Sequence, residues 1–285
     1  MKLGVNTVLF KPFSVMEAFK GIKQAGYDGV ELSAIPMMNP HLKLTSPEDT
    51  KKSIEEIRAA VAETGLELLS MELATQDPTL LRKAAAAAKE LGVPIINVGP
   101  IGKTGVEGDV EKCIETLKNS IAICKAYGVN LCMKAHAGAS VYNTETTQQV
   151  MAAITNDNFG VDMDPSHIFR AGEEPQEALP HIADRIKHIH IRDCKRPDPN
   201  AEPPVMPDGR PAPRGVIPPG PPVEQTCGRG DLDLAGYFKA LVDAKYEGPV
   251  CLEIIGPEQT YDGACSIAAE SFGYMNAILK ILGDR

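Results

Sequence analysis

The sequence predicts an α/β protein whose residues 1–285 form a single domain, a closed (β/α)8 barrel or TIM barrel. Three observations support this fold class. Eight short apolar runs alternate with eight helical patterns, and this alternation is typical of a parallel sheet. Glycine follows four of the predicted helices, where a left-handed cap is favoured. The length of 285 residues is large for one domain, yet α/β barrels of about 250 residues are common.

The first half of the chain contains four strand–helix units. Its strands are predicted at 3–6, 28–33, 66–73 and 94–100. Its helices are predicted at 14–25, 48–64, 78–91 and 110–127. The residue directly after each of these helices is a glycine, which adopts the left-handed backbone without strain: Gly26, Gly65, Gly92 and Gly128.

The second half repeats the pattern. Its strands are predicted at 129–136, 158–164, 185–193 and 248–256. Its helices are predicted at 144–155, 175–184, 232–244 and 263–282. An open doubly wound sheet is the alternative architecture, but no GxGxxG motif follows the first predicted strand to anchor a nucleotide.

Residues 197–222 interrupt this alternation after the predicted strand 185–193. The stretch contains eleven of the 23 prolines. Because proline removes a backbone donor and fixes φ, we expect neither a regular helix nor a central strand there. We interpret it as an insertion rather than a domain boundary. A surface excursion with partial polyproline character and a lid or subunit-contact arm both remain open, since active sites of barrels lie at this end of the strands.

The charge balance argues against nucleic acid and membrane partners. The chain has 29 Lys and Arg against 38 Asp and Glu, a net charge of −9, whereas nucleic-acid binding normally needs a basic surface. No apolar run approaches the roughly 18 residues of a membrane-spanning helix, and the N-terminal pattern is not that of a signal peptide. The seven cysteines lack a CxxC pair. We therefore expect a cytoplasmic protein with a small-molecule substrate, and leave homo-oligomerisation open.

Alternation along the later strands directs ionisable side chains into the barrel. In the strand 129–136, apolar Leu131 and Met133 face the helices, so Lys134 and His136 face inward. The same rule applied to the next three strands gives a further inward set: Asp162, Asp164, His188, His190, Arg192 and Glu253. Burying such groups together is costly unless they pair or bind a metal ion, so the cluster indicates an active site.

Three of these side chains form a candidate metal site. Asp164, His190 and Glu253 offer two carboxylates and an imidazole, a mixture that suits several divalent ions without selecting one. Three protein ligands with open positions are typical of a catalytic metal site. The alternative is a hydrogen-bonded network of Asp, His, Lys and Glu that contains no metal ion.

The sequence resembles the xylose isomerase-like barrels, which include sugar-phosphate isomerases, keto-sugar 3-epimerases and AP endonucleases of the endonuclease IV type. The segments that carry the resemblance are AGYDGVEL at 25–32, DPSH at 164–167, HIHIRDCKR at 188–196, TCGRGDLDL at 226–234 and VCLEI at 250–254. The endonuclease branch does not fit, because the chain lacks the extra metal ligands and the basic surface that those enzymes need.

The resemblance implies a sugar or keto-sugar substrate and a divalent metal ion, Mn²⁺, Mg²⁺, Co²⁺ or Zn²⁺, on Asp164, His190 and Glu253. It also implies that His167 contacts substrate oxygens and that Arg196 binds substrate. The remaining residues expected to line the substrate pocket are Asn6, Glu31, His136 and His188.

Lys134 is a departure from the family pattern. Relatives typically have a Glu-x-His motif at this strand, where the Glu is both a metal ligand and an acid/base group, but this chain has Lys134, Ala135 and His136. The symmetric mechanism with two glutamates therefore cannot operate unchanged. Lys134 can act as an acid or base, bind a substrate anion, stabilise an enolate or form a Schiff base. It can also replace the charge of a lost metal ion.

We expect an isomerase or epimerase that moves a proton next to a carbonyl group through an enediolate. Glu253 would take the proton, and Lys134 and His167 would stabilise the intermediate. A keto-sugar lyase or dehydratase is the second hypothesis, because the same enolate can expel a β-leaving group. A metal-free, non-catalytic barrel that binds a sugar is the third.

Overall fold

The eight strands pair in chain order and close into one parallel barrel. The computed structural model describes residues 1–196 and 220–285. Each strand is hydrogen-bonded to the next, and β1 (Lys2–Asn6) closes the barrel on β8 (Pro249–Leu252). Between them, in order, are β2 (Gly29–Ser33), β3 (Glu67–Glu72), β4 (Ile95–Val98), β5 (Asn130–Lys134), β6 (Phe159–Met163) and β7 (Ile186–Ile191). The predicted (β/α)8 barrel is confirmed.

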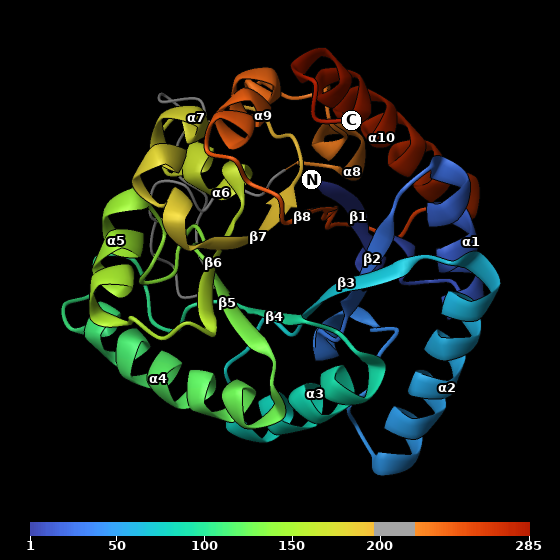
Figure 1. Cartoon of the computed structure of the whole chain (residues 1–285), viewed down its shortest axis with the longest axis horizontal. Helices are drawn as coiled ribbons and strands as arrows, with labels where there is room; N and C mark the ends of the chain where they lie inside the picture. The colour runs from blue at the N-terminus through green and yellow to red at the C-terminus, as the bar shows by residue number, and fades with distance from the viewer. Residues whose placement is uncertain (197–219) are drawn as a thin grey trace.

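The long helices form a ring around the strands, as Figure 1 shows. They are α1 (Val15–Ala25), α2 (Pro47–Thr64), α3 (Pro78–Leu91), α4 (Asp109–Tyr127), α5 (Thr144–Ala153), α9 (Leu234–Asp243) and α10 (Tyr261–Leu282). Among the described residues, no helix is both long and apolar enough to cross a membrane. The four glycines predicted to end helices all adopt a left-handed backbone: Gly26, Gly65, Gly92 and Gly128.

One predicted helix is wrong. Instead of a single helix over 175–184, the chain forms the short α7 (Pro175–Ala178) and two 3-10 turns, η3 (Leu179–His181) and η4 (Ala183–Arg185). Pro180 lies within this stretch, and a proline inside a helix removes a backbone donor and clashes with the preceding turn. The α-helix therefore cannot continue to residue 184.

A short helix that the sequence analysis missed begins directly after β6. This helix, α6 (Pro165–Arg170), is capped by Asp164, whose Oδ1 accepts a hydrogen bond of 2.8 Å from the backbone N–H of Ser166. An aspartate followed by proline is a strong signal for the start of a helix. The cap holds the Asp164 carboxylate at the end of β6, which is where the candidate site lies.

Three further short elements occur in loops: η1 (Thr7–Phe10), η2 (Pro36–Met38) and α8 (Pro222–Gln225). Most of the predicted insertion at 197–222 lies outside the described residues.

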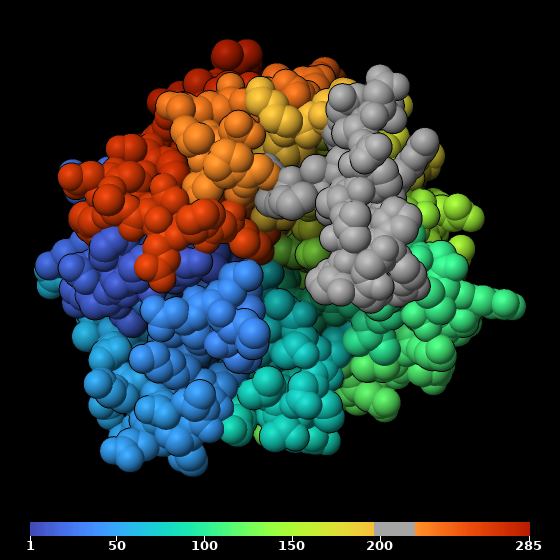
Figure 2. Space-filling view, turned by 180° about the vertical axis from the view of Figure 1, so that it is seen from behind, coloured from blue at the N-terminus to red at the C-terminus, as the bar shows by residue number. Residues whose placement is uncertain are grey.

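Figure 2 shows the face opposite to that of Figure 1, where the blue N-terminal segment lies beside the orange-red segment that follows β8. There Lys11 Nζ donates to the carbonyl oxygen of Gly256 at 2.9 Å.

The strands separate an apolar layer from a polar one. Side chains that point outward from the barrel, such as Leu131, Ile189 and Leu252, are fully buried against the helices. Alternate side chains on the same strands point inward, and near the strand ends many of them are polar or charged. The hydrophobic core therefore lies between barrel and helices, and the buried charged side chains lie inside the barrel.

Candidate active site

Lys134 is the cation at the centre of the candidate site. It ends β5, and its Nζ donates to Oε1 and Oε2 of Glu253 at 2.9 and 3.0 Å and to Oε1 of Glu72 at 3.1 Å. Burial alone would lower the pKa of Lys134, but the negative charges of Glu253 and Glu72 raise it above its ordinary value. The ammonium therefore stays charged and joins carboxyl groups from two distant parts of the chain.

Arg192 is a second buried cation and links Glu253 to Asp164. Its Nη1 lies 3.2 Å from Oε2 of Glu253, and its Nη2 donates to Oδ2 of Asp164 at 3.1 Å. Burial favours a raised pKa for Glu253, but the charges of Lys134, His190 and Arg192 hold that pKa well below its ordinary value. Glu253 is thus an ionised carboxylate compensated by the cations around it.

His190 lies between two other carboxylates. Its Nε2 makes a short hydrogen bond with Oε2 of Glu31, and its Nδ1 lies 2.7 Å from Oδ2 of Asp162. Burial opposes protonation of the ring, yet the charges of Asp162 and Glu31 raise the pKa of His190 well above its ordinary value. The pKa of Asp162 is correspondingly lowered despite its burial. The three groups form a buried, charge-paired chain.

The carboxyl of Glu72 is shared by two donors. Oε1 faces Lys134, and Oε2 accepts a hydrogen bond of 2.6 Å from Nδ2 of Asn6. The same amide nitrogen donates to Oε2 of Glu31 at 2.9 Å, so Asn6 joins the two glutamates. Burial and the nearby charge of Glu253 raise the pKa of Glu72 to about 8. Glu72 therefore tends to carry a proton at neutral pH.

A further set of polar side chains contacts Glu31 and Asp162. His188 Nδ1 lies 2.9 Å from Oδ1 of Asp162, and its Nε2 lies 2.8 Å from the hydroxyl of Ser70. Asn97 Nδ2 donates to Oε1 of Glu31 at 2.6 Å. These side chains come from β3, β4 and β7 and are fully buried or nearly so. Their hydrogen bonds fix the orientation of the Glu31 and Asp162 carboxylates.

His167 and His136 lie beside the cationic part of the site. His167 Nδ1 accepts from the backbone N–H of Ala137 at 3.0 Å, and its Nε2 lies 2.9 Å from Nη2 of Arg192. Burial lowers the pKa of His167 well below its ordinary value, so the ring is neutral. His136 is an exposed residue, and the centroid of its ring lies 4.1 Å from that of His167.

Arg196 lies apart from this cluster. Its guanidinium is 2.8 Å from Oε1 of Glu174 and stacks 4.2 Å above the centre of the Phe169 ring. More than half of its side chain is exposed. The other predicted site residues form one connected cluster, in which Glu72 and Arg192 provide links and His136 joins through its ring contact, whereas Arg196 has separate partners.

The sequence analysis did not single out three residues that the structure brings into the cluster. Glu72 and Ser70 alternate along β3, and Asn97 is a polar residue in the otherwise apolar β4. Their polarity at inward positions was the available signal. Each was missed because none of the family motifs includes β3 or β4.

Buried carboxylates and imidazoles of this kind suit a divalent metal ion. Within the described residues, three groups have donor atoms within 4.8 Å of one another: Glu31, His188 and Cys251; Asp162, His188 and His190; and Glu31, Glu72 and His190. Of the predicted ligands Asp164, His190 and Glu253, only His190 occurs in these three groups. Asp164 and Glu253 contact Arg192, and His190 lies between Glu31 and Asp162. As held, that set does not fit a metal ion.

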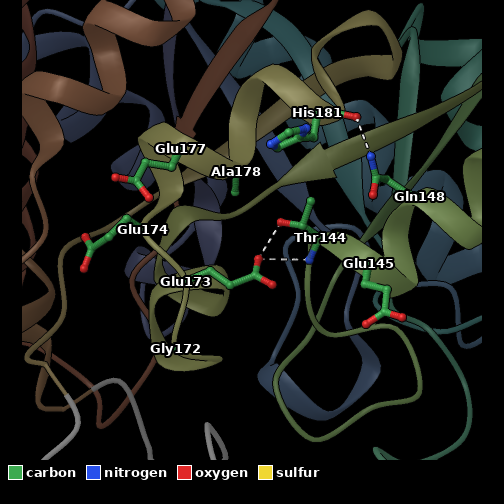
Figure 3. A pocket seen from close by; sticks show the side chains of 9 residues that line it. All are labelled: Thr144, Glu145, Gln148, Gly172, Glu173, Glu174, Glu177, Ala178 and His181. Atoms are coloured by element: carbon green, nitrogen blue, oxygen red, sulfur yellow. Dashed lines mark hydrogen bonds between the residues drawn. The ribbon is translucent and has the colours of Figure 1, made fainter.

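A cavity of about 490 Å³ lies outside the barrel, beside α5 and α7. Figure 3 shows the Glu173 carboxylate directed at Thr144, while Glu145 and Glu177 lie on opposite sides of the view. Glu173 Oε2 accepts from the backbone N–H of Thr144 at 3.1 Å, so it serves to cap a helix. The carboxylates of this cavity do not converge, in contrast to those of the barrel interior.

Comparisons with known proteins show the family and the fold of the chain. Residues 19–272 match the family described as xylose isomerase-like TIM barrel, and the chain belongs to this family. It is 29% identical over 145 residues to an inosose dehydratase from Clostridium perfringens, an alignment that spans 49% of this chain and only 45% of the dehydratase.

Solved structures share the fold along the whole chain. A D-tagatose 3-epimerase-like protein superimposes with a TM-score of 0.73 at 16% identity, covering 100% of this chain and 99% of the other. The structure of an IOLI protein with a bound zinc atom has a TM-score of 0.71 at 18% identity, with 99% and 98% coverage. At these identities the likeness is one of fold.

Proposed function

We propose that this protein is an isomerase or epimerase that moves a proton next to the carbonyl group of a sugar or keto-sugar. One observation carries the proposal: two carboxyl groups, Glu253 and Glu72, contact the same ammonium, that of Lys134. Epimerisation needs groups that remove and return a proton, and a positive charge beside the enediolate oxygen stabilises the intermediate. Membership in the xylose isomerase-like family supports this reaction class.

Each group has a proposed role. Glu253 takes the proton from the carbon next to the carbonyl, and the positive charge of Lys134 stabilises the oxygen that becomes negative. Glu72 returns a proton, so a carboxyl on β3 performs the task of the glutamate that β5 lacks. His167, a neutral ring beside Arg192, binds a substrate hydroxyl.

The remaining predicted substrate contacts are also proposals. His136 and Arg196 are the exposed members of this set. The others are Asn6, Glu31 and His188. The metal set of Asp164, His190 and Glu253 also stays a prediction. When bound, a divalent ion would polarise substrate oxygens, but no step here depends on one, because that set does not fit an ion as it is held.

A dehydratase acting on a keto-sugar is the second candidate. The curated relatives that match part of the chain include several inosose dehydratases. The chemistry is compatible with the same side chains: after Glu253 removes the proton, the enolate expels a hydroxyl group on the β-carbon, and a protonated group beside it completes the loss of water. We propose that Lys134 or Glu72, which contact each other at 3.1 Å, supplies that proton.

Incubation with keto-sugars in D₂O distinguishes the candidates. An isomerase or epimerase incorporates one solvent deuterium without a change in the heavy-atom formula, whereas a dehydratase gives a product that has lost one water, and mass spectrometry separates the two. Glu253→Gln should reduce the rate by roughly 10²- to 10⁴-fold. Exposed Lys195→Met serves as a control that should not alter it. The proposal is wrong if Glu253→Gln keeps the full rate.

A further inference from the structure

We infer that the ammonium of Lys134 takes the place of a divalent metal ion, so that this barrel holds its carboxyl groups and reacts without a metal cofactor. The reaction itself rests on the proposed function. The replacement of the ion by Lys134 is a separate claim about binding, and its test needs no substrate.

The first argument is the number of contacts that Lys134 makes. A lysine ammonium has three N–H donors. Three carboxylate oxygens lie around Nζ within 3.1 Å, two from Glu253 and one from Glu72. These are distances of charge-assisted hydrogen bonds, longer than the 2.0–2.6 Å of metal–oxygen bonds. Each of the three N–H donors therefore has one acceptor oxygen, and these are oxygens that a metal ion would otherwise bind.

The second argument concerns Glu253 and Asp164, the two carboxylates among the predicted ligands. Both oxygens of Glu253 face Lys134, and Oε2 also faces Arg192. Asp164 Oδ2 accepts from Arg192, and Oδ1 accepts from the hydroxyl of Ser166 at 2.6 Å. An ion would have to displace two resident cations from these oxygens and then remain close to both, which like-charge repulsion disfavours.

The third argument is that the remaining donors have internal partners too. His190 has one carboxylate on each ring nitrogen, from Glu31 and Asp162. The neighbouring group of Glu31, Glu72 and His190, which has the spacing of a metal site, is bridged by the amide of Asn6. The Oε2 atoms of Glu31 and Glu72 therefore already accept hydrogen bonds from Asn6. The charges within the barrel are balanced by side chains of the chain itself.

Titration with Mn²⁺ tests the inference on the intact protein. After treatment with EDTA and desalting, bound Mn²⁺ is measured by electron paramagnetic resonance and by calorimetry, for the wild type and for Lys134→Glu. We expect no saturable binding to the wild type up to about 1 mM Mn²⁺, and at least ~100-fold tighter binding of one ion to Lys134→Glu, which exchanges the ammonium for a carboxylate.

Two further variants serve as controls. Lys134→Met removes the charge without adding a ligand, and should bind Mn²⁺ more weakly than Lys134→Glu. Lys195→Glu makes the same charge change at an exposed pair with Asp231, and should behave like the wild type. Circular dichroism checks that each variant is folded.

Two results would overturn the inference. One is stoichiometric metal in the wild-type protein, either retained on purification or bound at micromolar Mn²⁺, and this result does not depend on any variant. The other is a folded Lys134→Glu that binds Mn²⁺ no better than Lys195→Glu. Neither result would refute the proposed proton transfer, which the D₂O experiment tests separately.

Discussion

Lys134 Nζ lies 2.9 and 3.0 Å from the two carboxylate oxygens of Glu253, which stands 119 positions later in the chain. The exposed fraction is 5% for the lysine side chain and 0% for the glutamate side chain. Removing one partner of a buried ion pair leaves the other charge uncompensated in a medium of low dielectric constant. We therefore expect that removing either partner destabilises the barrel interior.

Lys134→Met should destabilise the fold by about 3–5 kcal/mol, because it leaves Glu253 and Glu72 without their shared cation. The free energy of unfolding in urea measures the effect. Lys195→Met, at an exposed pair, should change it by about 1 kcal/mol or less. Adding Glu253→Gln to Lys134→Met should restore part of the loss. A Lys134→Met protein as stable as Lys195→Met would contradict the buried pair.

Glu72→Gln should lower kcat for proton exchange by roughly 10²- to 10⁴-fold, because an amide cannot return a proton as a carboxylic acid does. Glu67→Gln is the matched control: it lies on the same strand, but its side chain is exposed and paired with Lys2. Steady-state kinetics of deuterium incorporation measures both variants. Equal rates for the two would remove Glu72 from the proposed mechanism.

Gly65→Ala should cost about 1–2 kcal/mol, because Gly65 has a φ of +67° and an L-residue is strained there. No atom lies within 4 Å of the added Cβ, so the effect measures backbone strain alone. Gly273→Ala is the opposite control. It lies within α10, also with open space around the new Cβ, and should gain about 0.5–1 kcal/mol. Urea denaturation should show the two changes with opposite signs.

The buried His41 should make the fold less stable in acid. Burial lowers the pKa of His41, whose Nε2 is hydrogen-bonded to the carbonyl oxygen of Phe13 at 3.1 Å. As the pH falls below about 6.5, the unfolded chain takes up a proton that the native state resists, so stability is lost. His41→Gln retains a donor but does not titrate. The decrease in Tm between pH 7 and pH 5 should be smaller in this variant, whereas exposed His181→Gln should leave it unchanged.

The order of strands and helices could be predicted because its signals are local. Apolar runs, helix periodicity and a helix-ending glycine such as Gly65 are signals that extend over only a few residues. The alternation of apolar and polar residues within 129–136 predicted that Lys134 points into the barrel, where it is buried. The failure at 175–184 was also local, since Pro180 breaks a helix whose apolar pattern continues past it.

The sequence by itself determined the barrel and the inward direction of its charged side chains, because both follow from the spacing of residues along one strand or helix. Only the tertiary structure decided which charges meet. Glu72 and Lys134 are 62 positions apart, and closing the barrel is what brings Glu72, Lys134 and Glu253 together. Whether a carboxylate faces a metal ion or an ammonium depends on distances across the barrel axis, which no spacing along the chain contains.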